Sequence, residues 1–136
     1  MAAVLKISNP EDNHASDGML RSITMIRKND GDVALGTSVF LWSHYSAPQI
    51  ADGHLFAVGV CIGFERSEDL KSATITVAIS NRRPPSVWRT QELDALKNRN
   101  DGSPATEIAD QVRGFTHDHV GHVSPDAAAL MAARFT

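Results

Sequence analysis

The sequence lacks the features that cross-link a chain or hold it in a membrane: one of its 136 residues is cysteine, and no long run is apolar. The single thiol, Cys61, has no partner for an intrachain disulfide, and its place within the apolar run 56–64 is typical of a small buried side chain in a reducing compartment. A membrane-spanning helix needs about 18 consecutive apolar residues, and a secretory leader needs an apolar segment behind a basic start. Neither pattern is present, so the sequence predicts a cytoplasmic protein without a membrane partner.

An excess of charge of one sign is also missing. Thirteen basic and 16 acidic residues leave a formal net charge of −3, with a pI of about 6.0. This balance argues against nonspecific coating of nucleic acid, because such binding depends on dense neutralisation of phosphates. Residues 82–99 are the local exception, with five basic and two acidic side chains. They form the one basic patch of the sequence.

The composition is that of one globular domain, with 42% hydrophobic and 21% charged residues. A chain of this size buries about two-thirds of its unfolded surface and needs no disulfide to fold. We therefore expect residues 1–136 to form a single domain. Because the sequence ends within a helical pattern, we also expect it to be a piece of a longer protein, with any catalytic domain following Thr136.

Hydrophobic periodicity predicts an α+β fold. Apolar content, length and two-residue alternation between faces predict strands at 3–8, 38–44, 55–64 and 73–80. Helical spacing predicts helices at 87–99, 106–112 and 127–135, the last capped by Ser124 with Pro125 in its first turn. Residues 18–28 fit either structure, with a helix favoured, and 114–123 read as a short strand or loop. Large side chains on both faces of 38–44 indicate a central strand.

The strand 55–64 is bulky on one face and nearly bare on the other. Gly59 and Gly63 share the bare face with two other small residues, Ala57 and Cys61. Glycine inside a strand indicates a bulge, a bend or a close approach to the backbone. We therefore expect strong curvature here, as in a barrel.

Catalytic motifs are weak. His117, His119 and His122 are spaced so that a metal-dependent or histidine-based hydrolase stays an alternative. Ser43, His44 and Asp52 are a nominal triad, but no nucleophile elbow supports them. No glycine-rich phosphate loop is present either. We expect no catalytic residue, metal or cofactor in this domain.

The aromatic residues point to a different chemistry. The chain has two tryptophans, Trp42 at a strand end and Trp88 beside a basic Pro-Pro turn, and one tyrosine, Tyr45. Core packing is the ordinary role of a tryptophan, and a protein-interaction domain with buried tryptophans stays open. Aromatic faces also stack on nucleobases, at roughly 1 to 3 kcal/mol per base. Ser43, His44 and Asn9 would then hydrogen-bond to the edge of such a base.

The order of motifs resembles the EVE domains of the PUA-like superfamily. The similarity is carried by Ser-Asn-Pro-Glu at 8–11, Val-Phe-Leu-Trp-Ser at 39–43 and Gly-His-Leu-Phe-Ala-Val-Gly-Val at 53–60. It covers about residues 4–64, with looser agreement in the proline-containing turn and the last helix. The family's Gly-Asp turn directly precedes the aromatic strand, whereas here Gly31-Asp32 comes several residues early.

The resemblance implies a PUA-like, curved and mostly antiparallel β-barrel with surrounding helices, whose cleft accepts a flipped, modified base in an aromatic cage. Relatives include YTH readers of modified RNA and EVE modules fused to HNH nucleases in modification-dependent restriction. Carried onto this chain, the residues expected at the base are Trp42, Ser43, Tyr45, Trp88, Asn9 and His44. Those expected at phosphates are Arg82, Arg83 and Arg89. The leading hypothesis is a noncatalytic DNA-binding module that recognises modified cytosine, with DNA favoured over RNA.

Overall fold

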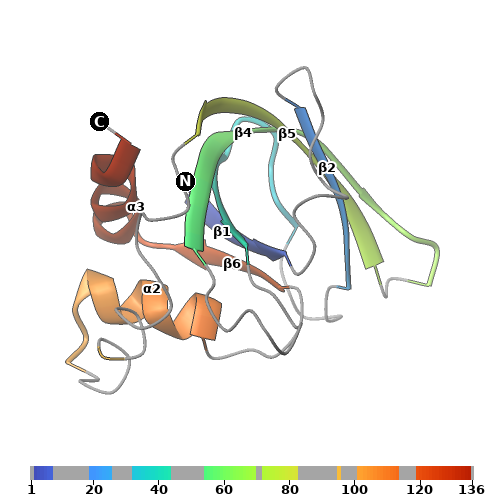
Figure 1. Ribbon diagram of the computed structural model, residues 1–136. Coiled ribbons are helices and arrows are strands. Elements are labelled where there is room, and N and C mark those ends of the chain that lie inside the picture. Colours follow the sequence, from blue (N-terminus) through green and yellow to red (C-terminus); the bar gives the residue numbers. More distant parts are fainter. Residues whose placement is uncertain are drawn as a thin grey trace, which may run out of the picture.

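The computed structural model describes residues 2–7, 19–25, 32–43, 54–69, 72–82, 95, 101–113 and 119–135. The elements form an α+β fold, as the hydrophobic pattern predicts (Figure 1). The strands are β1 (Ala2–Ile7), β2 (Met19–Met25), β3 (Ser38–Ser43), β4 (His54–Arg66), β5 (Ser72–Arg82) and β6 (His119–Val123). The helices are α2 (Pro104–Arg113), α3 (Pro125–Ala132) and the short 3-10 helix η1 (Ala133–Phe135).

The six strands form one sheet in the order β2-β5-β4-β3-β1-β6. Every pair is antiparallel except β1 with β3, which run parallel. The sheet curls strongly, so that Cα atoms of its two edge strands, β2 and β6, come within 8 Å of each other (Figure 1). Within the described residues no ladder joins these edges. The expected curvature is therefore present, in a sheet whose hydrogen bonding stays open between β2 and β6.

Irregular pairing along β4 accompanies this curvature. The register between β4 and β5 shifts between Val58 and Gly59 and again between Cys61 and Gly63. Such bulges bend a strand and increase its twist. At Gly59 a Cβ atom would overlap the backbone carbonyl oxygen of Ala78, so only glycine allows this approach of the two strands. The prediction of a bent strand with close backbone contact is confirmed.

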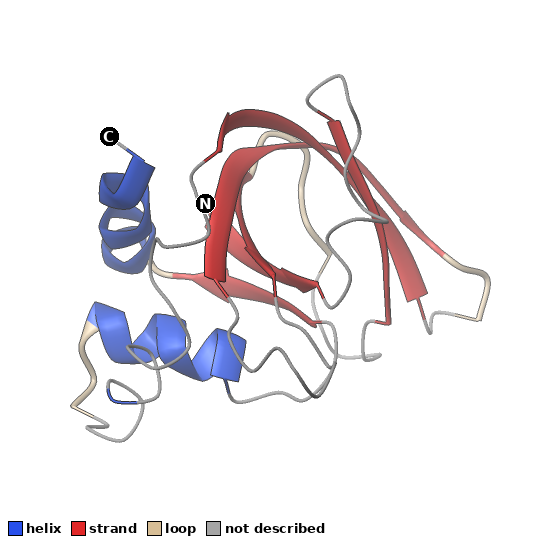
Figure 2. Cartoon of the chain, viewed as in Figure 1, coloured by secondary structure: helices blue, strands red, loops and turns tan. Residues whose placement is uncertain are grey.

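Two apolar clusters lie on the two faces of the sheet. Both α2 and α3 lie on one side of it (Figure 2). The helix-side cluster is formed by residues of the sheet and of these helices. It comprises Ala2, Val4, Phe40, Trp42, Leu55, Ile108, Ala109, Val112, Val123, Ala127, Met131 and Phe135. The strand-side cluster on the other face comprises Leu5, Val33, Val39, Leu41, Ala57, Cys61, Ala73, Ile75, Val77 and Val120. Burying large side chains on both faces stabilises β3 and β1 at the centre of the sheet, as predicted for residues 38–44.

Local hydrogen bonds define the start of α3. The Ser124 hydroxyl accepts from the Ala127 amide at 3.2 Å and donates to Glu107 Oε2 at 2.7 Å, and Pro125 occupies the first turn. Glu107 Oε1 also accepts from the Ser124 amide at 2.7 Å, which ties α3 to α2. The predicted cap is thus confirmed. No helix within the described residues has the length and apolar composition needed to cross a membrane.

The helix favoured for residues 18–28 is wrong. Residues Met19–Met25 form β2, which pairs antiparallel with β5 over its whole length. The outer edge of β5 exposes backbone donors and acceptors, and pairing with β2 satisfies them. Residues 119–123 form a strand, which resolves the strand-or-loop alternative. The helix predicted at 87–99 lies outside the described residues apart from Ala95, which is helical.

Candidate functional site

Several strand termini meet at one end of the sheet. Because β1 and β3 are parallel, their last residues, Ile7 and Ser43, are partners in the ladder. Ser43 also pairs with His54, the first residue of β4. Nearby pairings bring in the end of β5 (Ala57 with Arg82) and the start of β6 (Lys6 with His119). We call this region the Ser43 end, defined by Ile7, Ser43, His54, Arg82 and His119.

The Ser43 end connects separate parts of the predicted site. Asn9 follows the last residue of β1 by two positions, and His44 and Tyr45 follow β3 directly. Arg83 follows the last residue of β5. The ends of β1, β3 and β5 therefore lie at one end of the sheet. Each of the three predicted segments continues from one of these strand ends. The structure describes only the backbone of Ser43 and Arg82, and Asn9, His44, Tyr45, Arg83, Trp88 and Arg89 lie outside the described residues.

Trp42 differs from its prediction. Its side chain is 1% exposed and belongs to the helix-side cluster, with Leu55 on β4 and Val112 on α2. The helices cover this face of β3, so the indole presents no open face on which a base could stack. The expected position of Trp42 at an exposed rim is therefore wrong.

The Trp42 indole nitrogen has an unusual environment. Nε1 is buried and has no hydrogen-bond partner within the described part of the chain. Buried N–H groups are paired in the great majority of cases, because an unmade hydrogen bond costs about 1 to 3 kcal/mol. The register between β3 and β4 also shifts between Leu41 and Trp42, which marks a bulge at this point.

Lys6 is a buried lysine that the sequence reasoning missed. It is 2% exposed and is the ladder partner of both Trp42 and His119. Lys6 shares its face of β1 with Ala2 and Val4, which both belong to the helix-side cluster. The sequence signal for this burial was a lysine at a strand position that shares a face with apolar residues. Lys6 thus places a buried polar side chain near the Ser43 end.

The histidine alternative loses support from β6. His119 and His122 are three positions apart on β6, a spacing at which strand positions do not share a face. His122 is exposed, and His117 lies outside the described residues. Within the described ranges no three His, Cys, Asp or Glu residues are placed to hold a metal ion. The nominal triad is not described beyond the backbone of Ser43.

Cys61 is buried at 0% exposure in the strand-side cluster. Its thiol lies 3.4 Å from the Gly63 carbonyl oxygen and 3.9 Å from that of Val33. Burial raises the pKa of the thiol, and the hydrogen bond to Gly63 opposes this in part. Because the thiolate is the nucleophile, a buried thiol with a raised pKa is unreactive. The predicted burial of Cys61 is confirmed, and its low reactivity stays a prediction.

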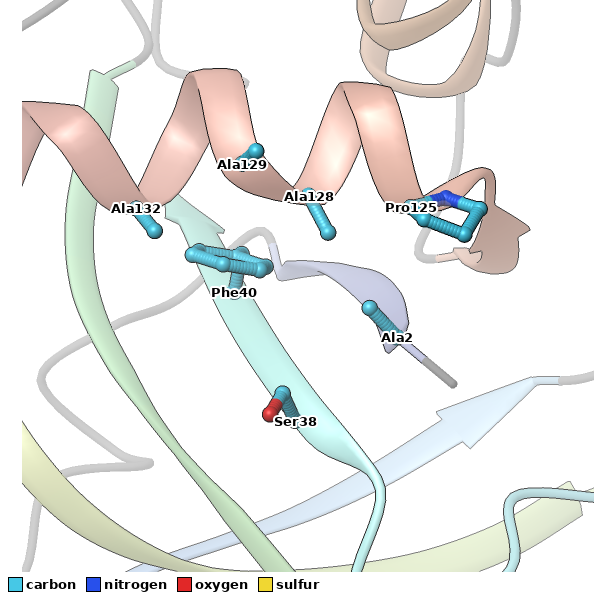
Figure 3. Close-up of a pocket in the computed structure, with 7 residues that line it drawn as sticks. All are labelled: Ala2, Ser38, Phe40, Pro125, Ala128, Ala129 and Ala132. Atoms are coloured by element: carbon cyan, nitrogen blue, oxygen red, sulfur yellow. The ribbon is translucent and has the colours of Figure 1, made fainter.

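An apolar cleft lies at the opposite end of β1 and β3. Its volume is about 340 Å³, and α3 lies across it from the first residues of these strands (Figure 3). The lining residues are Ala2, Ser38, Phe40, Pro125, Ala128, Ala129 and Ala132. The Ser38 hydroxyl is its one polar side chain, and no lining side chain is titratable. The cleft contains none of the predicted site residues.

Comparisons of the chain with protein-family models, curated proteins and solved structures find no match. The resemblance to EVE domains remains an expectation drawn from the motifs. We therefore argue function from the residues and geometry of the Ser43 end.

Proposed function

We propose that the chain is a nucleic-acid-binding module that holds an extruded, modified base at the Ser43 end. The convergence of strand termini carries this proposal, because the segments containing Asn9, Ser43–Tyr45 and Arg82–Arg83 start from that one end. A base must leave its stack before a protein can surround it, and aromatic and hydrogen-bonding groups then replace its lost partners. The favoured target is modified cytosine in DNA.

The residues divide into three roles under this proposal. Tyr45 and Trp88 stack on the base, since stacking tolerates any base with an open ring face. Asn9, Ser43 and His44 hydrogen-bond to its edge and supply selectivity. Arg82, Arg83 and Arg89 contact phosphates, which position the strand without reading its sequence. The domain binds and performs no chemistry of its own.

A PUA-like barrel of the EVE type is the architecture proposed. Three features support it: the strong curl of the sheet, the approach of β2 to β6 within 8 Å, and the two helices packed on one face (Figure 2). A curled sheet of this kind has strand ends around an opening, where loops can surround a ligand.

A binding screen tests the proposed function. Oligonucleotides with plain, methylated or hydroxymethylated cytosine, or with methylated adenine, are titrated by fluorescence anisotropy at two salt concentrations. We expect one modified-cytosine oligonucleotide to bind at least about tenfold more tightly than its plain counterpart, because its base makes contacts the plain base lacks. Substituting Arg82 and Arg83 by Ala should weaken all oligonucleotides alike and reduce the salt dependence. Absence of binding at low salt would overturn the proposal.

A protein-interaction domain is the second candidate, because apolar residues are exposed beside the cleft. Val60 and Ile62 are 39% and 48% exposed, and Val60 pairs with Ser38 of the cleft lining. Charged variants Val60→Lys and Ile62→Lys separate the two functions. Under the proposed function they keep the affinity for modified DNA, since this surface is remote from the Ser43 end. Loss of that affinity with the fold retained would place the binding surface here instead.

A further inference from the structure

Helix α3 carries apolar residues on all of its sides. Among its 8 residues Asp126 is the one charged side chain, and the others are apolar. Ala127 and Met131 are buried in the helix-side cluster, which accounts for one side of the helix. A surface helix turns a polar face to water, whereas a helix that is apolar all round is covered on every side. The outer side of α3 therefore has the composition of an interface.

This outer side is nevertheless open to solvent. The helix lies at the edge of the described fold, with the strands on its other side (Figure 2). Small side chains there allow a second helix to approach closely, towards the short end of the usual interaxial distance of about 8 to 10 Å. We call this surface the α3 face, defined by the exposed residues Pro125, Asp126, Ala129, Ala132 and Ala133.

Exposed apolar residues continue from the α3 face onto the sheet. The cleft beneath α3 is lined by Ala128 and Ala132 on the helix and by Ser38 on β3 (Figure 3). Ser38 is the ladder partner of Val60, which is 39% exposed, and Ile62 follows two positions along β4 with 48% exposure. The α3 face, the cleft and these two residues thus form one apolar region.

The charges at the two ends of the α3 face have opposite signs. Asp126 lies in the first turn of α3 and Arg134 lies in η1, and both are exposed. Asp126 precedes Leu130 by four positions, and Arg134 follows it by four. Two antiparallel copies related by a two-fold axis at Leu130 therefore place each Asp126 opposite Arg134 of the other copy. Antiparallel packing also sets the positive end of each helix dipole beside the negative end of the other.

We propose that the α3 face binds the α3 face of a second copy of this chain, antiparallel, with an Asp126–Arg134 ion pair at each end. One self-complementary patch serves both copies in a two-fold dimer, which is the commonest assembly. Burial of apolar surface supplies the attraction, and the ion pairs fix the orientation.

The size of the α3 face determines the strength of this dimer. Helix α3 has 8 residues and η1 has 3, whereas a standard interface uses about 20 to 30 residues on each side. The dimer is therefore weak and reversible. It is independent of the proposed function, because the cleft and the Ser43 end lie at opposite ends of β1 and β3.

Sedimentation equilibrium of the natural chain at increasing concentration tests the self-association. We expect the mean mass to rise with concentration from 14.7 kDa, the mass of one chain, towards twice that value. A mean mass that stays at 14.7 kDa at every concentration would overturn the inference.

Charge reversal tests the arrangement of the two copies. Asp126→Arg and Arg134→Asp should each weaken self-association by at least about tenfold, because like charges then face each other at both ends. An equimolar mixture of the two variants restores both ion pairs between unlike chains, and its association should return to within about threefold of the natural value. Asp110→Arg, the same charge change on the exposed face of α2, is the control and should leave association unchanged. A mixture that associates no better than either variant alone would rule out the antiparallel pairing.

Chemical cross-linking locates the interface without altering these charges. Ala129→Cys places a thiol one position from the two-fold axis, so a short bis-maleimide reagent should join two copies of this variant. Asp110→Cys and the natural chain, whose Cys61 is 0% exposed, are the controls and should stay uncrosslinked under the same conditions. Equal cross-linking of Ala129→Cys and Asp110→Cys would show that the copies do not meet through α3.

Discussion

At the scale of single residues, environment determines what each side chain does. Trp42 was predicted to stack on a ligand, yet the helices that cover β3 bury it. Lys6 lies in a strand that the sequence predicted, but its burial at 2% exposure appears only in the structure. Gly59, in contrast, has the role its sequence context indicated, since the carbonyl of Ala78 occupies the space of a side chain.

Substitution of Gly59 gives a prediction at this scale. Gly59→Ala should destabilise the fold by roughly 3 kcal/mol, since the new methyl group meets backbone that cannot move without breaking the β4–β5 ladder. Gly63→Ala is the matched control, because a Cβ there lies 3.3 Å from the Thr76 side chain, which can adjust. Its cost should stay below about 1 kcal/mol. Urea unfolding of both variants measures the difference, and equal losses would contradict the account.

At the scale of elements, capping and pairing decide where helices and strands begin. The cap of α3 was visible in the sequence as Ser124-Pro125, because capping depends on residues only a few positions apart. The identity of β2 was not visible, since residues 18–28 satisfy helical and strand periodicity together. Its pairing with β5, more than 45 residues away, selects the strand.

The start of α2 gives a prediction for pH dependence. Hydrogen bonds from Ser103 and Thr106 lower the pKa of Asp101 from 3.8 to about 2. A depressed folded-state pKa stabilises the fold above the unfolded pKa, and this contribution is lost as the pH falls from 3.8 towards about 2. Asp101→Asn should therefore lower the free energy of unfolding at pH 6. It should also make that free energy less dependent on pH between 3.8 and about 2.

The measurement is urea unfolding at several pH values between 2 and 6, with Asp110→Asn on the exposed face of α2 as a control for charge removal. Parallel pH profiles for the natural chain and Asp101→Asn would contradict the role assigned to Asp101.

At the scale of the whole molecule, the curled sheet encloses one apolar cluster and supports another beneath the helices. The two clusters share the central strands, so opening either one should disturb the other. The same topology collects strand termini at the Ser43 end and places the apolar cleft at the other end of β1 and β3 (Figure 3). The proposed binding site and the cleft are therefore separate surfaces.

Reactivity of Cys61 tests this cooperativity. The thiol is 0% exposed in the strand-side cluster, so a thiol reagent reaches it only when the sheet opens. We expect negligible modification in the absence of denaturant, and modification that follows the urea unfolding curve recorded by circular dichroism. Rapid stoichiometric modification of the native protein would show that the sheet opens locally.

By itself the sequence determined the strands β1, β3, β4 and β5, the last two helices and the bend at Gly59, because these depend on periodicity, capping and glycine within short stretches. Only the tertiary structure decided that residues 19–25 are a strand, that Trp42 and Lys6 are buried, and that strand ends distant in the chain meet at Ser43. These features depend on which surfaces pack together, and long-range packing leaves no periodic pattern in any one segment.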